Sequence, residues 1–128
     1  MKKFGGEIIK KIINGYLKNI TENTCDNFNI PAIINKNKIN YIFNDTKHIV
    51  YIKDNEVILL RENKDMKNIL TFSKNRSILS EYIIKSNNIQ VDILVETLDL
   101  LIEEDLIYVQ YKIPDSNCVY EYRINIGG

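Results

Sequence analysis

Two side chains able to bind an anion lie across from one another in the expected fold, Arg61 and His48. Arg61 ends the segment Glu56–Arg61, in which Leu59 and Val57 occupy the same face. Alternate residues of a strand share a face, so this pattern points the guanidinium toward the interior or the rim of the domain. Its five N–H donors suit backbone carbonyls, in a structural role, or the carboxylate or phosphate of a ligand.

Three tyrosines are further candidates for contact with a ligand, namely Tyr82, Tyr111 and Tyr122. Each falls on the side of its expected strand that also carries Ile and Val. Aromatic rings interspersed with Lys can stack on nucleic acid bases, but such stacking needs exposed rings. We therefore expect these tyrosines in the interior, where they pack the core and orient a ligand together with Arg61 and His48.

The sequence carries no recognisable catalytic centre, cofactor motif or metal site. Zinc needs three or four nitrogen or sulfur ligands, whereas the chain has one His and two distant cysteines, Cys25 and Cys118. No G-x-S-x-G elbow, P-loop or dinucleotide fingerprint is present. The acidic run Glu103–Asp105 lacks the further ligands of a calcium loop and is interpreted as a solvated turn. These absences favour a non-enzymatic protein without cofactor or metal.

Composition and charge narrow the class of protein further. The 128 residues fit one domain spanning 1–128, and 45% apolar with 27% charged residues is typical of a globular chain. Seventeen basic and seventeen acidic residues cancel, so we expect no nucleic acid partner. No apolar segment is long enough to span a membrane or to form the core of a signal peptide. The low number of cysteines is typical of a protein whose thiols stay reduced. We therefore expect a cytoplasmic protein that contacts no membrane.

The first part of the chain has the pattern of an amphipathic helix over residues 7–20. Isoleucines and other apolar residues recur there at spacings of one, three and four, with lysines and asparagines between them. Residues 21–37 are rich in Asn and contain Pro31, which predicts an irregular segment with at most an edge strand over 32–35. We expect the helix to pack its apolar stripe on the hairpin that contains Tyr51 and Ile58.

From Lys38 onward the period changes to two, which predicts an antiparallel β meander over residues 38–126. Asp54-Asn55 is a tight-turn dipeptide that pairs His48 with Arg61 and Val50 with Leu59. A second turn at Asn87-Asn88 pairs Tyr82 with Ile93. A third turn over residues 114–117 pairs Tyr111 with Tyr120. Residues 98–105 fit either a strand with a bulge or a helical turn.

Seven or eight such strands predict a mainly β, up-and-down barrel with an N-terminal amphipathic helix. Closure would remove the exposed edges that a sheet this apolar must otherwise protect. The alternative is an α+β fold, in which an open antiparallel sheet packs on the helix.

Residues 47–113 resemble the YwiB-like family of small bacterial proteins of unknown function. The similarity rests on the EVILLR strand ending in Arg61, the segment Leu70–Phe72, the SEYIIK strand with Tyr82, and VETL followed by an acidic loop and IYVQYKI. It implies a lipocalin-like (calycin) barrel and no catalytic residue. In place of glycines typical of the family, this chain has Glu62-Asn63 and Asn87-Asn88.

Two functions remain open on these observations. In the first, the barrel binds a small ligand, partly apolar or anionic, in its interior, at a site formed by Arg61, His48, Tyr82, Tyr111 and Tyr122. In the second, side chains fill the barrel, and the protein is a structural or protein-interaction module that contacts an unknown protein partner.

Overall fold

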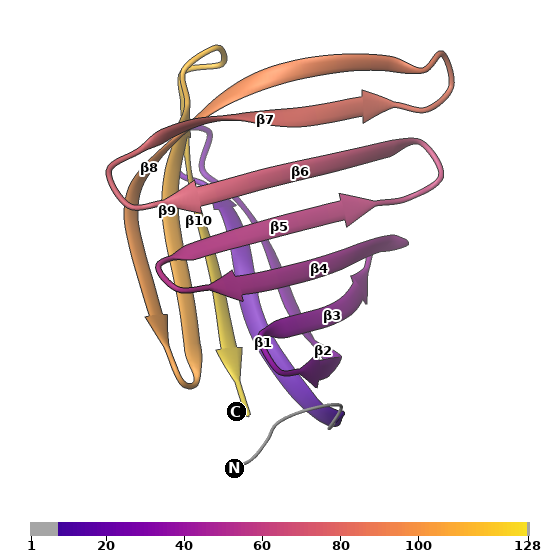
Figure 1. The fold of residues 1–128 in the computed structure, drawn as a ribbon, viewed down its shortest axis with the longest axis vertical. Helices are drawn as coiled ribbons and strands as arrows, with labels where there is room; N and C mark the ends of the chain where they lie inside the picture. Colours follow the sequence, from indigo (N-terminus) through magenta and orange to yellow (C-terminus); the bar gives the residue numbers. More distant parts are fainter. Residues whose placement is uncertain (1–7, 128) are drawn as a thin grey trace.

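The computed structural model describes residues 8–127, which form one closed antiparallel barrel of ten strands (Figure 1). Each strand pairs with the next along the chain, and β1 closes the barrel against β10. The strands are β1 (Ile9–Asn19), β2 (Thr24–Asn35), β3 (Lys38–Phe43), β4 (Thr46–Lys53), β5 (Glu56–Glu62), β6 (Met66–Ser73), β7 (Ser77–Ile84), β8 (Ile89–Glu103), β9 (Leu106–Ile113) and β10 (Cys118–Ile126).

Two layers of strands enclose the core. In Figure 1, β3–β7 run across the front of the molecule, while β1, β2, β9 and β10 run steeply behind them. The long β8 belongs to both layers, because a bulge between Thr97 and Asp99 bends it from β7 toward β9. The most deeply buried apolar side chains come from both layers and include Ile13, Val50, Val57, Phe72, Val95, Val109 and Ile124.

The N-terminal helix predicted over residues 7–20 is wrong. Ile9–Asn19 is strand β1, and Glu7 lies outside the described residues. The apolar positions fit the period of a helix and that of a strand, because residues four apart share a face in both. Ile13 and Leu17 point inward, while Ile8 and Ile12 point outward. Pairing with both β2 and β10 decides in favour of the strand. No helix of any length occurs between residues 8 and 127, and so none there could cross a membrane.

The predicted count of seven or eight strands is also wrong, because β1 and β2 join the barrel in place of a helix and a loop. The alternative of an open sheet packed on the helix is wrong for the same reason. The closed circuit of pairings leaves neither an open sheet nor a helix in the part of the chain described.

Pro31 lies inside β2 and does not break it, contrary to the sequence-based prediction. The backbone carbonyl of Asn37 accepts a hydrogen bond from the backbone N–H of Ile52 on β4. Backbone N–H and C=O groups alternate in direction along a strand, so those of Asn37 and of every second residue after it point toward β4. The backbone groups of Ile42 therefore point toward β2. The rung beyond Ile33–Asn40 would join Ile42 to Pro31, which has no N–H to donate. Pairing between β2 and β3 ends there, which leaves a seam in the barrel wall.

Gly15 of β1 lets strands approach closely beside this seam. A Cβ atom at Gly15 would collide with the backbone carbonyl of Arg123 on β10 and lie 2.9 Å from the ring of Phe28. The absence of a side chain therefore lets β10 pair closely with β1 and leaves room for the Phe28 ring inside the barrel.

The predicted hairpins are confirmed in two cases and shifted in one. His48 pairs with Arg61, and Tyr111 pairs with Tyr120, both in the predicted register. The hairpin between β7 and β8 has a longer turn, so Tyr82 pairs with Val91 instead of Ile93. Because the shift is two residues, each side chain keeps the predicted face. Residues 98–103 continue β8, which settles their ambiguity in favour of a bulged strand.

The side chains of β1 give a direct test of the strand in place of the helix. Ile12 is 54% exposed and Ile13 is 0% exposed. We expect Ile13→Asp to destabilise the fold by more than about 4 kcal/mol, because it buries an unpaired charge. Ile12→Asp should cost no more than about 1 kcal/mol, because its carboxylate stays in water. Urea unfolding of both variants measures the difference, and equal losses would contradict the inward and outward assignment.

Candidate functional site

A row of polar and aromatic side chains crosses the inner wall of the barrel from β3 to β7. Tyr41 pairs with His48, His48 with Arg61, Arg61 with Asn68, and Asn68 with Tyr82. Directly opposed residues on one face of an antiparallel sheet have Cβ atoms about 5 Å apart, so neighbours in the row are in contact range. The barrel therefore places a guanidinium, an imidazole, an amide and two phenols side by side.

Arg61 is held in place by the side chain of Asn68. The Asn68 amide oxygen accepts hydrogen bonds from Nε of Arg61 at 3.2 Å and from Nη2 at 2.8 Å. The Asn68 amide nitrogen donates to the backbone carbonyl of Glu81 at 3.0 Å, which fixes which end of the amide faces Arg61. Asn68 is 2% exposed, so this anchor is inside the wall. Arg61 therefore donates these hydrogen bonds to a side chain. A purely structural role, as considered from the sequence, predicted hydrogen bonds to backbone carbonyls instead.

No carboxylate neutralises Arg61 among the described residues. The two ion pairs found between residues 8 and 127 are Lys74–Asp99 and Lys85–Glu62, both at the surface. A guanidinium has five N–H donors, and Asn68 takes two of them, which leaves three. Arg61 is half-buried and lines an internal cavity, and its guanidinium makes no further hydrogen bond to residues 8–127.

Tyr41 is packed between two rings and linked to the opposite wall. Its hydroxyl lies 2.5 Å from the hydroxyl of Tyr122 on β10, so the two phenols hydrogen-bond across the barrel. Its ring stacks on His48 at 4.5 Å between centroids and on Phe28 at 5.2 Å. Phe43 packs on the other side of Phe28 at 5.7 Å. This stack closes the inner side of the seam between β2 and β3.

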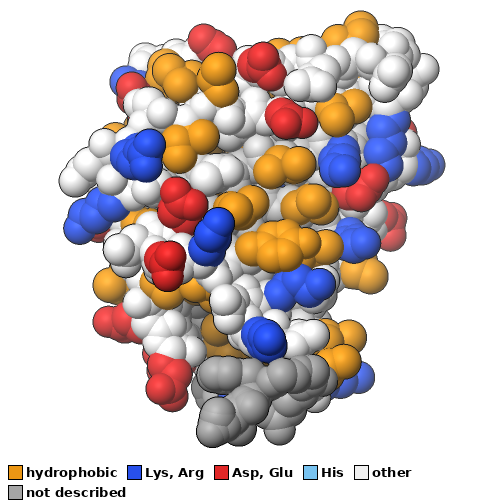
Figure 2. All heavy atoms as spheres, viewed as in Figure 1, with side chains coloured by type: hydrophobic (Ala, Val, Ile, Leu, Met, Phe, Trp, Pro, Cys, Tyr) orange, Lys and Arg blue, Asp and Glu red, His pale blue; other side chains and the backbone are white. Residues whose placement is uncertain are grey.

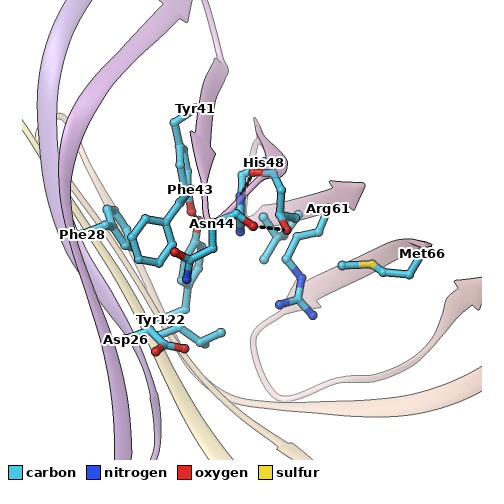
Figure 3. Close-up of a pocket in the computed structure, with 12 residues that line it drawn as sticks. Asp26, Phe28, Tyr41, Phe43, Asn44, His48, Arg61, Met66 and Tyr122 are labelled. Atoms are coloured by element: carbon cyan, nitrogen blue, oxygen red, sulfur yellow. Dashed lines mark hydrogen bonds between the residues drawn. The ribbon is translucent and has the colours of Figure 1, made fainter. Parts of the chain in front are cut away.

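A cavity of about 140 Å³ lies between Arg61 and this aromatic stack (Figure 3). Figure 3 shows the Arg61 side chain reaching into the space from β5, with Phe28, Phe43 and Tyr122 on the far side and Met66 at the near edge. Its lining comes from seven strands and one turn: Leu17, Asp26, Phe28, Tyr41, Phe43, Asn44, Thr46, His48, Leu59, Arg61, Met66 and Tyr122.

Burial keeps the imidazole and phenol groups of this cavity uncharged at pH 7, so Arg61 is its charged inner side chain. Burial is the largest cause that lowers the pKa of His48, to about 4; the hydrogen bond to the Thr46 carbonyl raises it and the Arg61 charge lowers it. His48 is therefore neutral at pH 7. Burial also raises the pKa values of Tyr41 and Tyr122 far above the ordinary value, so both phenols keep their protons. Asp26 brings a carboxylate only at the exposed rim.

The residues predicted from the sequence divide into two groups. Arg61, His48 and Tyr122 line the cavity. Tyr111 is 3% exposed and lies outside the cavity lining, where it packs against Phe72 and Tyr120. Tyr82 is next to Asn68 in the row but is half-buried and does not line the cavity.

Sequence reasoning missed Asn68, Tyr41 and Phe28. Asn68 alternates with Leu70 and Phe72 in β6, and a polar residue on an otherwise apolar face is a signal that could have identified it. Tyr41 alternates with Ile39 and Phe43 in β3, but this pattern does not show that its hydroxyl and ring contribute to the site. Nothing in the sequence around Phe28 distinguishes it, because its role depends on Gly15 of a neighbouring strand.

A second hollow lies on the outer side of the same seam. It has a volume of about 400 Å³ and a mainly apolar lining that includes Pro31, Ile33 and Ile42, with Lys10 and Lys47 beside them. Tyr41 lines this hollow and the inner cavity. At the seam beside Pro31, the Tyr41 side chain therefore lies between the inner cavity and the outer hollow.

Among solved structures, the crystal structure of the YwiB protein from Bacillus subtilis is similar to this chain. The superposition has a TM-score of 0.68 and covers 94% of this chain and 91% of that one, at 15% sequence identity. The superposition shows a common fold, which confirms at the level of fold the resemblance suggested by the sequence. No family model and no curated protein matches the chain.

The buried imidazole makes stability depend on pH in a defined direction. The unfolded chain binds a proton at His48 near pH 6.5, whereas the folded chain binds it near pH 4. The unfolded state thus holds more protons between these values, so stability falls as the pH is lowered. We expect the free energy of unfolding to drop by about 2 kcal/mol from pH 7 to pH 5 because of this group.

Urea unfolding at the two pH values measures the drop, with His48→Phe as the control that keeps a ring on Tyr41. His48 is the only histidine of the chain, so the variant should lose most of the pH dependence in this range. The same drop in both proteins would show that His48 is not the group responsible.

Proposed function

We propose that this chain, which has the fold of the YwiB protein, is a non-enzymatic barrel that binds a small, partly apolar anion between Arg61 and the aromatic stack. The observation that carries this proposal is an inward-facing guanidinium with a neutral anchor and three remaining N–H donors. Withdrawing a cation from water without a counter-ion costs several kcal/mol. A carboxylate bound to the remaining donors would offset that cost through charge-assisted hydrogen bonds.

The size and lining of the cavity restrict the ligand. A volume of about 140 Å³ is close to that of an apolar cavity that holds one benzene ring. Phe28, Phe43 and Leu59 supply apolar contact for such a body, while Arg61 binds its charged end. Asp26 at the rim disfavours a second negative charge. The proposed ligand is therefore a monocarboxylate about one ring in size, in a role like that of a lipocalin.

The remaining predicted tyrosines have supporting roles in this proposal. Tyr122 holds Tyr41 in position through the hydrogen bond between their hydroxyls. Tyr111 packs on Phe72 in the core outside the cavity lining, and in this proposal its ring limits the length of the ligand. Tyr82 has no contact with the ligand. The seam between β2 and β3 is the expected route of access, because Tyr41 alone lines both of its sides.

A second candidate function, a protein-interaction module, has a separate observation in its favour. Hydrophobic side chains are spread over the outer surface of β3–β7 among Lys, Asp and Glu (Figure 2). Tyr51 is 37% exposed on β4, in the hairpin that the predicted helix was expected to cover, and Ile42 is 70% exposed on the neighbouring β3. Under this alternative, small carboxylates would have no effect on the protein, so the experiment below separates the two candidates.

Sodium benzoate is a suitable probe of the proposed site, because it joins one carboxylate to one ring. We expect it to raise the melting temperature of the wild type, by roughly 5 °C at ten times its dissociation constant. Arg61→Met should abolish this shift, and Arg61→Lys should weaken it, because the lysine keeps the charge but loses the planar donors. The shift is read within each variant, so a change in a variant's own stability does not affect the result.

Arg76→Met is the matched control, since Arg76 is exposed in the turn between β6 and β7 and lies outside the cavity lining. It should respond to benzoate as the wild type does. A wild type that does not respond would contradict binding at this site and favour the second candidate. An Arg61→Met variant that responds as the wild type does would also contradict binding at this site, because benzoate would then bind elsewhere.

A further inference from the structure

The position of the proton on His48 follows from one hydrogen bond. Nδ1 of His48 lies 3.0 Å from the backbone carbonyl of Thr46. A carbonyl oxygen only accepts, so Nδ1 carries the proton and donates it. Because burial keeps the imidazole neutral at pH 7, its other nitrogen, Nε2, carries a lone pair. The cavity wall therefore has a fixed hydrogen-bond acceptor at His48.

This acceptor has no partner among the described residues. The rings of His48 and Tyr41 are stacked with an angle of 10° between their planes, so the edge of the imidazole points away from the Tyr41 ring. The Tyr41 hydroxyl is occupied with Tyr122. Among residues 8–127, the fully buried side-chain atom that lacks a hydrogen-bond partner is Oγ of Ser80. Nε2 of His48 is therefore reached by solvent, and water or a ligand that enters the cavity can donate a hydrogen bond to it.

The residue that carries this acceptor lies beside Arg61 on the wall of the cavity. His48 and Arg61 are directly opposed on neighbouring strands and both line the cavity. A carboxylate satisfies Arg61 but repels the lone pair on Nε2, because both are electron-rich. The two requirements are met together only by a ligand that presents an acceptor to Arg61 and a donor to His48 at neighbouring positions.

We propose that the ligand is a hydroxy acid of about one ring, whose carboxylate binds Arg61 and whose hydroxyl donates a hydrogen bond to Nε2 of His48. This inference rests on the proposed function and adds the chemical class of the ligand to it. An N–H group in place of the hydroxyl meets the same requirement. Asp26 at the rim is a further acceptor, which agrees with a ligand that carries a donor and a single negative charge.

Matched pairs of ligands test this inference. The probes are benzoate, the 2- and 3-hydroxybenzoates, and the corresponding methoxybenzoates, which keep the oxygen but have no hydrogen to donate. We expect the wild type to bind at least one hydroxybenzoate about five- to tenfold more tightly than its methoxy counterpart, the gain typical of one hydrogen bond. Isothermal titration at pH 7 measures both dissociation constants.

His48→Phe is the decisive variant, because it keeps a ring against Tyr41 and removes the acceptor. In this variant the ratio of the two dissociation constants should fall to about one, while benzoate still binds. His48→Met, which also has no strong acceptor and adapts to irregular spaces, serves the same purpose should the Phe variant not fold.

The outcomes separate this inference from the proposed function. If none of the probes binds to the wild type, or if all bind equally to Arg61→Met, the proposed function fails. If benzoate binds through Arg61 but the hydroxyl gives no gain, the present inference alone is wrong. A hydroxyl gain that persists in His48→Phe would also overturn it, because the donor would then be meeting another acceptor.

Discussion

The pair of hydrogen bonds from Arg61 to the amide oxygen of Asn68 determines what the inner wall of this barrel can do. A guanidinium on an otherwise apolar wall must be held by partners, and Asn68 supplies a neutral one. The neutrality of Asn68 matters because a carboxylate in its place would neutralise the positive charge of Arg61. Asn68 is held in turn by the Glu81 carbonyl on β7, so the orientation of Arg61 depends on the pairing of three strands.

The space in front of Arg61 depends on two residues in the first two strands. Gly15 leaves room for Phe28, whose ring then stacks on Tyr41. Pro31 ends the pairing of β2 with β3, so these strands separate where the cavity lies. A side chain at Gly15 would displace the Phe28 ring and push β1 and β10 apart, whereas a donor at position 31 would let the pairing of β2 with β3 continue. The cavity thus results from backbone chemistry on one side of the barrel and from polar side chains on the other.

Features of this structure that depend on residues close together in the sequence were predictable, and features that depend on distant residues were not. The pairing of His48 with Arg61 was predictable, because a turn dipeptide and alternation over a few residues determine it. β1 was not, since its isoleucines fit a helix as well as a two-faced strand, and the choice depends on pairing with β10 more than a hundred residues later. Asn68 and Tyr41 were missed as site residues because their roles come from neighbours on adjacent strands.

The most direct test of the account is native mass spectrometry of the protein purified gently from the cells that make it. A ligand held by Arg61 predicts a wild-type mass that exceeds the mass of the chain by that of one small acid, and an Arg61→Met variant at the mass of the chain alone. It also predicts that the released molecule contains a single carboxylate. The mass of the bare chain for both proteins, or the same bound molecule on both, would contradict a ligand held by Arg61.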